Sequence, residues 1–199
     1  MLERASALAA ELRKSGYDGL DRRRGLQVGE ARGWSLLQLA AFPPSGTELH
    51  GAVQRALDME LPDRIGEATV NAGRALLKIG PEHFWLVTRG GGENELLLRS
   101  AVTPAIGSVL TLTHSRTCIW IKGPRSPEVL ATAIAVDLDP GIFRRGCFAL
   151  TGLHHTPVLL YHSGETLYEL YVLRSFAVWT WEWLTDAALP FGYDVAAAD

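Results

Sequence analysis

Three carboxylates in the second half of the chain could accept hydrogen bonds from a bound molecule. Asp137 and Asp139 follow a stretch with helical periodicity, and Glu165 lies in the turn at residues 163–165, before a strand-like run. An ionised carboxylate only accepts hydrogen bonds, so it suits a ligand that presents N–H groups. Aspartate beside proline and glutamate beside glycine are also ordinary turn residues. The residue types alone therefore leave a ligand site and plain turns open.

The histidines, serines and cysteines lack the spacings of known catalytic or metal sites. No HExxH pair occurs among the histidines, and neither Ser115 nor Ser163 lies in a GxSxG elbow. Cys118 and Cys147 form no CxxC pair, and each lies in an apolar run, as buried thiols of a reducing compartment do. We therefore assign no catalytic residue and no metal ligand to this chain.

Aromatic residues gather in residues 175–188, which we expect to form the closing helix. Phe176, Trp179 and Trp183 share one face at helical spacing, whereas Trp181 falls on the opposite side. Exposed patches of large aromatic side chains mark contacts with partners. The alternative is a tryptophan that lies flat over its own surface loops. We take these four aromatic residues as candidate interface residues.

Composition excludes several classes of protein. The 199 residues are 47% hydrophobic, which is enough for one core or two small ones. The net charge of −3 does not suit nucleic-acid binding. No apolar run reaches the ~18 residues of a membrane-spanning helix, and no signal peptide is evident at the start. We therefore expect a cytoplasmic protein that binds neither nucleic acids nor membranes.

Helices alternate with strand pairs, and the connections within pairs are too short for parallel crossovers. This pattern predicts an α+β fold of mainly antiparallel sheets covered by helices. A capping box at Ser45 and Glu48 predicts one helix start. The expected strand pairs are 26–28 with 34–40, 75–79 with 84–88 and 109–113 with 117–121, followed by strands 147–150, 158–161 and 167–173. The expected helices are 1–14, 45–57, 93–101, one from Ser126 to about Ile134, and 175–188.

The same pattern gives an expected domain organisation. An N-terminal helix and arm would occupy residues 1–25, and one α+β domain residues 26–190. The candidate halves of that domain are 26–105 and 106–190. A flexible tail would occupy 191–199, because chain ends fray unless they are held.

Three blocks of sequence resemble a known family. GPRSPEVLATAIAVDLDPGIFRRG at 123–146 resembles the strand, GP turn, helix and acidic loop of the aminomethyltransferase superfamily, the fold of the glycine-cleavage T-protein. HSGETLYELYV at 162–172 resembles its TGE turn and the following strand. DLDP, RGCFALTGL and LRSFAVWTWEWL are similar to the gamma subunits of heterotetrameric sarcosine oxidases.

This resemblance implies a folate-binding type of fold with two related halves and a role in a complex. Such complexes oxidise sarcosine to glycine and produce hydrogen peroxide. They release the one-carbon unit as formaldehyde or pass it to tetrahydrofolate as 5,10-methylenetetrahydrofolate. The resemblance also implies alpha, beta and delta subunits as partners. FAD, FMN, NAD and tetrahydrofolate would belong to those subunits, with no cofactor in this chain.

The resemblance places two residues of this chain at folate positions. Asp137 matches the acidic residue that contacts folate in the T-protein, and Glu165 matches the glutamate of the TGE turn. The superfamily's acidic DxSH segment corresponds to TLTHS at 111–115, which has no aspartate. We therefore expect a vestigial pocket in an accessory, non-catalytic gamma-type subunit. The alternatives are a stand-alone tetrahydrofolate-binding one-carbon-transfer protein and a self-associating scaffold without a ligand.

Overall fold

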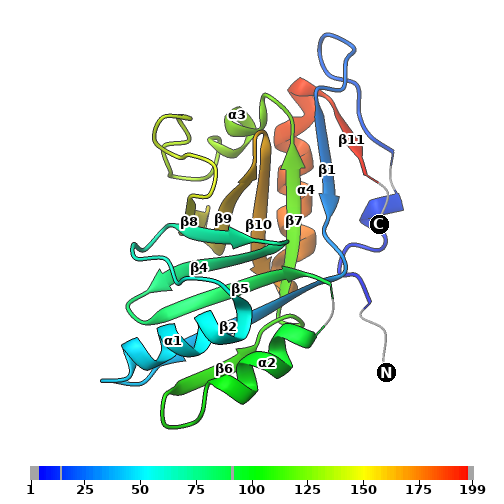
Figure 1. The fold of residues 1–199 in the computed structure, drawn as a ribbon. Coiled ribbons are helices and arrows are strands. Elements are labelled where there is room, and N and C mark those ends of the chain that lie inside the picture. The colour runs from blue at the N-terminus through cyan, green and yellow to red at the C-terminus, as the bar shows by residue number, and fades with distance from the viewer. Residues whose placement is uncertain (1–4, 14, 91, 197–199) are drawn as a thin grey trace. The chain divides into compact units, whose positions relative to one another are not determined.

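A computed structural model describes residues 5–13, 15–90 and 92–196 and divides the chain into two compact units (Figure 1). The smaller unit is Gly33–Thr113, and the larger unit combines Met1–Arg32 with His114–Asp199. The boundaries differ from the expected halves, because the segment before Gly33 joins the C-terminal part of the chain. Each unit has its own sheet and its own apolar core.

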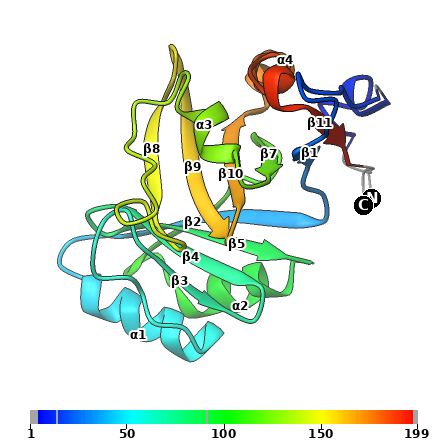
Figure 2. The same ribbon diagram turned by 90° about the horizontal axis from the view of Figure 1, so that it is seen from above.

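The smaller unit is an antiparallel sheet covered by two helices. The helices α1 (Gly46–Leu57) and α2 (Glu93–Ala101) lie on the same face of the sheet (Figures 1 and 2). Side chains alternate along a strand, so Leu37 and Leu39 on one strand and Phe84 and Leu86 on its neighbour share the core beneath these helices. The strand order is β3 (Ala68–Asn71), β4 (Arg74–Gly80), β5 (His83–Arg89), β2 (Trp34–Ala41) and β6 (Gly107–Thr111).

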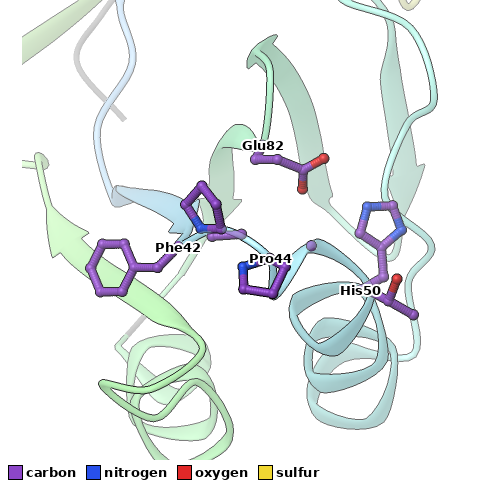
Figure 3. A pocket seen from close by; sticks show the side chains of 8 residues that line it. Phe42, Pro44, His50 and Glu82 are labelled. Carbon is purple, nitrogen blue, oxygen red and sulfur yellow. The ribbon is translucent and has the colours of Figure 1, made fainter.

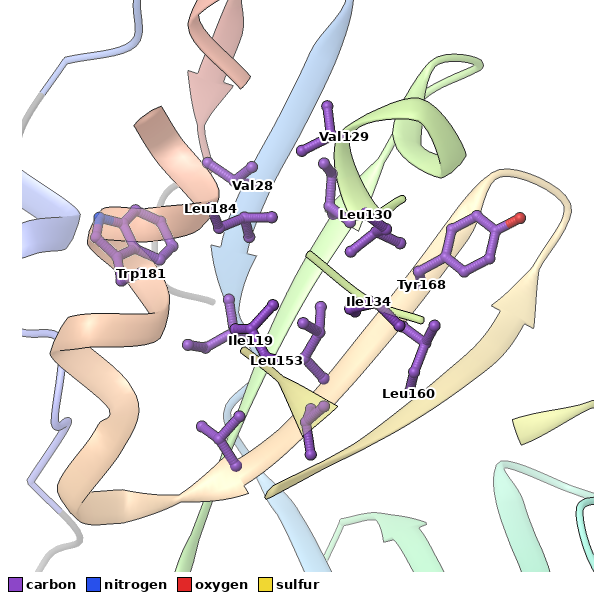
Figure 4. Packing of buried hydrophobic residues seen from close by; sticks show 14 of the residues in the cluster. Val28, Ile119, Val129, Leu130, Ile134, Leu153, Leu160, Tyr168, Trp181 and Leu184 are labelled. Atoms are coloured by element: carbon purple, nitrogen blue, oxygen red, sulfur yellow. The ribbon is translucent and has the colours of Figure 1, made fainter. Parts of the chain in front are cut away.

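The larger unit has a six-stranded sheet with α3 (Ser126–Leu130) and α4 (Ala177–Ala188). Its core, drawn in Figure 4, combines alternate residues of the strands with side chains from both helices. The strand order is β11 (Tyr193–Val195), β1 (Leu26–Glu30), β7 (Arg116–Lys122), β10 (Leu167–Leu173), β9 (Thr156–Gly164) and β8 (Phe148–Leu153). Only the pairing of β1 with β11 is parallel in the described sheet. The prediction of an α+β fold with mainly antiparallel sheets is therefore confirmed.

Two of the predicted strand pairings are wrong. β1 pairs with β7 and β11, whereas β2 pairs with β5 and β6. Likewise, β6 and β7 form no hairpin, because β7 lies between β1 and β10. Strand β7 is buried along most of its length, so it needs a neighbour on each side, and such neighbours come from distant parts of the chain. The predicted pair β4 and β5 forms as expected.

Several helix ends differ from their predictions. In the described part of residues 1–14, the regular structure is a 3-10 helix, η1 (Glu11–Arg13), in place of a long helix. The start of α1 is correct, but Ser45 makes no side-chain capping hydrogen bond, so the capping box is wrong. Helix α3 ends at Leu130 rather than near Ile134. There, the Thr132 hydroxyl donates to the Val129 carbonyl at 2.7 Å, which competes with helical hydrogen bonding.

Part of the C-terminal segment expected to be a flexible tail forms regular structure. Residues Leu189–Phe191 form a 3-10 helix, η3, and β11 then adds to the edge of the sheet beside β1. Residues 197–199 of the predicted tail lie outside the described residues. Another 3-10 helix, η2 (Arg174–Phe176), precedes α4 where Ser175 was expected to cap it. No helix in the described ranges is long and apolar enough to cross a membrane.

Candidate functional site

The two carboxylates assigned by resemblance lie in exposed turns of the larger unit. Asp137 Oδ1 accepts a hydrogen bond from the backbone N–H of Asp139 at 3.0 Å, and Asp139 Oδ1 accepts one from Gly141 N–H at 2.8 Å. These are consecutive Asx turns, in which the side chain shapes its own backbone. Glu165 is exposed in the turn between β9 and β10. Binding of a ligand by Asp137 and Glu165 stays a prediction.

A buried histidine links the loop that carries Asp137 to the turn that carries Glu165. The His162 ring stacks on Tyr168, with ring centroids 4.3 Å apart, and on Phe143 at 6.2 Å. Its Nδ1 lies 2.9 Å from the Phe143 carbonyl, and its Nε2 lies 3.4 Å from the Glu165 carbonyl. A neutral imidazole donates from one nitrogen only, so the shorter contact favours the Nδ1–H tautomer. Sequence reasoning missed this role, since nothing in the spacing pairs His162 with Phe143.

The closing helix exposes part of its aromatic content. Phe176, Val178 and Trp179 are 39%, 42% and 40% exposed, respectively. The ring of His154, from the turn between β8 and β9, lies edge-on to Trp179 at 6.0 Å and to Trp183 at 6.3 Å. We call Phe176, Trp179, Trp183 and His154 the α4 aromatic surface, because the first three share one helical face and His154 contacts two of them. They form a mixed apolar and aromatic patch of the kind found at the centre of protein interfaces.

Trp181 does not belong to this surface, which corrects the predicted interface set. It is 2% exposed and packs in the core of the larger unit with Leu184 and Val28 (Figure 4). The inner face of α4 is Ala177, Trp181, Leu184 and Ala188. Helix α4 is apolar around most of its circumference, so periodicity alone does not show which face is buried.

A cavity of about 480 Å³ lies in the smaller unit. Its walls come from the end of β2, the start of α1 and the turn between β4 and β5. Figure 3 shows the Glu82 carboxylate directed toward the space beside the His50 ring, with Phe42 at the other end of the pocket. The His50 ring is also held edge-on to Phe84, with centroids 6.0 Å apart. The cavity is lined by Ala41, Phe42, Pro43, Pro44, Gly46, Thr47, His50 and Glu82. No motif in the sequence brings Glu82 to the start of α1, so sequence reasoning missed this pocket.

Comparisons with known proteins agree on one family. The model of the sarcosine oxidase gamma subunit family matches residues 44–189. The chain is 32% identical to the sarcosine oxidase subunit gamma of Corynebacterium sp. (strain P-1), over 79% of this chain and 77% of the relative. It is 31% identical to the subunit gamma of Corynebacterium sp. (strain U-96), over 94% of this chain and 89% of that protein.

Solved structures give the same picture. A chain of the heterotetrameric sarcosine oxidase from Corynebacterium sp. U-96, in complex with pyrrole 2-carboxylate, aligns with a TM-score of 0.84 at 30% identity and covers 98% of both chains. The glycine cleavage system aminomethyltransferase T from Bartonella henselae aligns with a TM-score of 0.61 at 18% identity, over 87% of this chain and 48% of that chain. This second likeness shows a shared fold alone.

Proposed function

The chain belongs to the sarcosine oxidase gamma subunit family, and we propose that it is an accessory, non-catalytic subunit of a complex that oxidatively demethylates sarcosine. The products would be glycine, hydrogen peroxide and either formaldehyde or 5,10-methylenetetrahydrofolate. The partners would be alpha, beta and delta subunits, which would hold FAD, FMN, NAD and tetrahydrofolate. The observation that carries this proposal is the full-length structural match to a chain of a heterotetrameric enzyme.

Local geometry supports a role without catalysis. The carboxylate of Asp137 accepts the hydrogen bond of an Asx turn. The side chains of the segment that corresponds to the acidic DxSH motif also make hydrogen bonds within the smaller unit. In that segment, the Thr111 hydroxyl donates to Glu95 Oε1 at 2.7 Å, and Thr113 Oγ1 accepts the N–H of Leu36 at 2.9 Å. These threonines support the ends of strands, where the superfamily places an acidic residue.

The α4 aromatic surface supports docking on a partner, which we propose to be the alpha subunit. Phe176 and Trp179 offer large apolar areas, and burying such anchors gives most of the binding free energy at typical interfaces. The cysteines Cys118 and Cys147 are both free thiols. Free thiols suit a reducing compartment, so we propose that the complex is cytoplasmic.

The test is assembly of the four co-expressed subunits with surface variants of this chain. Trp179→Ala and Phe176→Ala should each weaken assembly by about tenfold or more, as expected for interface anchors. The matched control is Leu96→Ala, which removes a side chain that is 72% exposed on α2 in the other unit. The control should assemble as the wild type does. Equal assembly of all three variants would contradict the proposal that the α4 aromatic surface docks on a partner.

The purified chain by itself should show neither flavin absorbance nor sarcosine oxidation.

A further inference from the structure

The carboxylate of Glu82 is unusual in its surroundings. Its Oε2 is buried and has no hydrogen-bond partner among the described residues. Buried polar atoms almost always have a partner, and an unpaired one costs roughly 1–3 kcal/mol. The backbone of Glu82 has a φ of 52°, a left-handed conformation that is uncommon for a residue with a side chain. Orphaned polar atoms and backbone strain of this kind gather at functional sites.

The start of α1 is shaped to receive this carboxylate. Gly46 is the first residue of the helix, and a Cβ there would lie 2.8 Å from Glu82 Oε2 and 3.3 Å from Oε1. The absence of a side chain at position 46 therefore lets the carboxylate lie against the first turn. The positive end of the helix dipole attracts a negatively charged group at this place. The Glu82 carboxylate therefore lies in the wall of the cavity beside the first turn of α1, which does not cancel its charge.

The other walls of the cavity suit an aliphatic stem. Phe42, which is 46% exposed, and the rings of Pro43 and Pro44 provide apolar surface in the wall of the pocket. A lysine or arginine side chain has this combination of an aliphatic stem and a cationic N–H donor. The family places this chain beside other subunits, so a donor from a partner would explain why Glu82 Oε2 has no donor among the residues that the structure describes.

We propose that the cavity between Pro44, His50 and Glu82 receives a lysine or arginine side chain from another subunit of the complex. This inference rests on the proposed function. The cation would bind the Glu82 carboxylate, and its stem would pack on Phe42 and Pro44. The contact would therefore be a second, charged docking point, separate from the α4 aromatic surface in the other unit.

The experiment measures the affinity of the full-length chain for the remaining subunits, as a function of sodium chloride concentration. Glu82→Gln keeps the size of the side chain and removes its charge, and it should weaken binding by roughly 30-fold or more, as loss of one partner of a buried charge pair does. Glu48→Gln is the matched control, because Glu48 is exposed in the first turn of α1 and does not line the cavity. It should bind like the wild type. Phe42→Ala changes an exposed side chain and should weaken binding severalfold. This variant tests the proposal even if Glu82→Gln does not fold.

The outcomes separate this inference from the proposed function. If the wild type assembles and Glu82→Gln assembles with the same affinity and salt dependence, the inference is wrong and the proposed function stands. If the wild type joins no complex, the proposed function itself fails. Titration of the isolated chain with n-butylammonium chloride provides a further arm. Binding that depends on Glu82, together with unchanged assembly of Glu82→Gln, would mean that the pocket holds a small free amine and would overturn the proposal.

Discussion

Gly29 of β1 lies directly opposite Trp120 of β7, and the indole of Trp120 covers the space that a side chain at position 29 would occupy. A Cβ there would come within 2.5 Å of indole Cζ2. The pairing holds a strand from the beginning of the chain in the sheet built by its C-terminal part. This contact therefore bears on how the larger unit is assembled from two distant segments.

Gly29→Ala should destabilise the chain by about 1–3 kcal/mol, because the indole or the strand must move to make room. Urea unfolding followed by tryptophan fluorescence measures this loss. The control is Gly51→Ala in α1, where the new Cβ would meet the flexible end of Arg55 at 3.1 Å. Replacing a helical glycine should raise stability by ~0.5–1 kcal/mol. Equal effects of the two variants would contradict the close approach of Gly29 and Trp120.

Two tryptophans of α4 should behave oppositely on substitution. Trp181→Ala should lower the free energy of unfolding by about 3–5 kcal/mol, because Trp181 is buried in the core. Trp179→Ala removes a side chain that is 40% exposed and contacts His154, so it should cost only about 0.5–1.5 kcal/mol. Thermal unfolding of the isolated chain measures both. A larger loss from Trp179→Ala than from Trp181→Ala would mean that the inner face of α4 has been assigned wrongly.

Tyr161 should make stability depend on pH under alkaline conditions. Burial, aided by the nearby Glu169 carboxylate, raises the pKa of Tyr161 to about 12. An unfolded tyrosine loses its proton near pH ~10. Between about pH 10 and pH 12 the folded chain holds more protons than the unfolded chain, so the free energy of unfolding falls as pH rises.

The measurement is urea unfolding across this alkaline range for the wild type and Tyr161→Phe. The variant lacks the phenol, so its decline should be shallower. Burial also raises the pKa of Tyr168, so some decline should remain in the variant. Identical slopes for both proteins would contradict the assignment to Tyr161.

Titration with tetrahydrofolate should produce no heat beyond dilution. Asp137 Oδ1 already accepts the N–H of Asp139, and the segment at 111–115 has no carboxylate. Isothermal calorimetry of the wild type and Asp137→Asn should therefore give the same flat traces. Heat that appears with the wild type and disappears with Asp137→Asn would instead favour a one-carbon-transfer function for this chain.

Local signals in the sequence predicted the positions of helices and strands better than they predicted which strands pair with each other. Gly80 and Pro81 mark the turn between β4 and β5, and strong helical periodicity marks α1, so both were found. The partners of β1 and β6 depend on contacts between distant segments, which no local pattern encodes. Helix α4 has apolar residues on most sides, so its buried face could not be read from spacing.

Of the candidate sites, the aromatic surface of α4 could be predicted in part from the sequence, whereas the pocket at Glu82 could not. Composition and spacing predicted four aromatic residues between 176 and 183 as interface candidates, and of these Phe176 and Trp179 are exposed whereas Trp181 is buried. Their role in an interface stays a prediction. The pocket at Glu82 could not be predicted. Its carboxylate meets Gly46 only because the turn before β5 approaches the start of α1 in the folded unit.

Assembly of the purified chain with the alpha, beta and delta subunits tests the central proposal most directly. Sedimentation velocity of the four mixed proteins should show this chain in a single complex with sarcosine oxidase activity, and the chain alone should be inactive. The Trp179→Ala chain should sediment separately from the other subunits at concentrations where Leu96→Ala remains bound. A wild-type chain that sediments alone in the presence of all three subunits would contradict the proposed role.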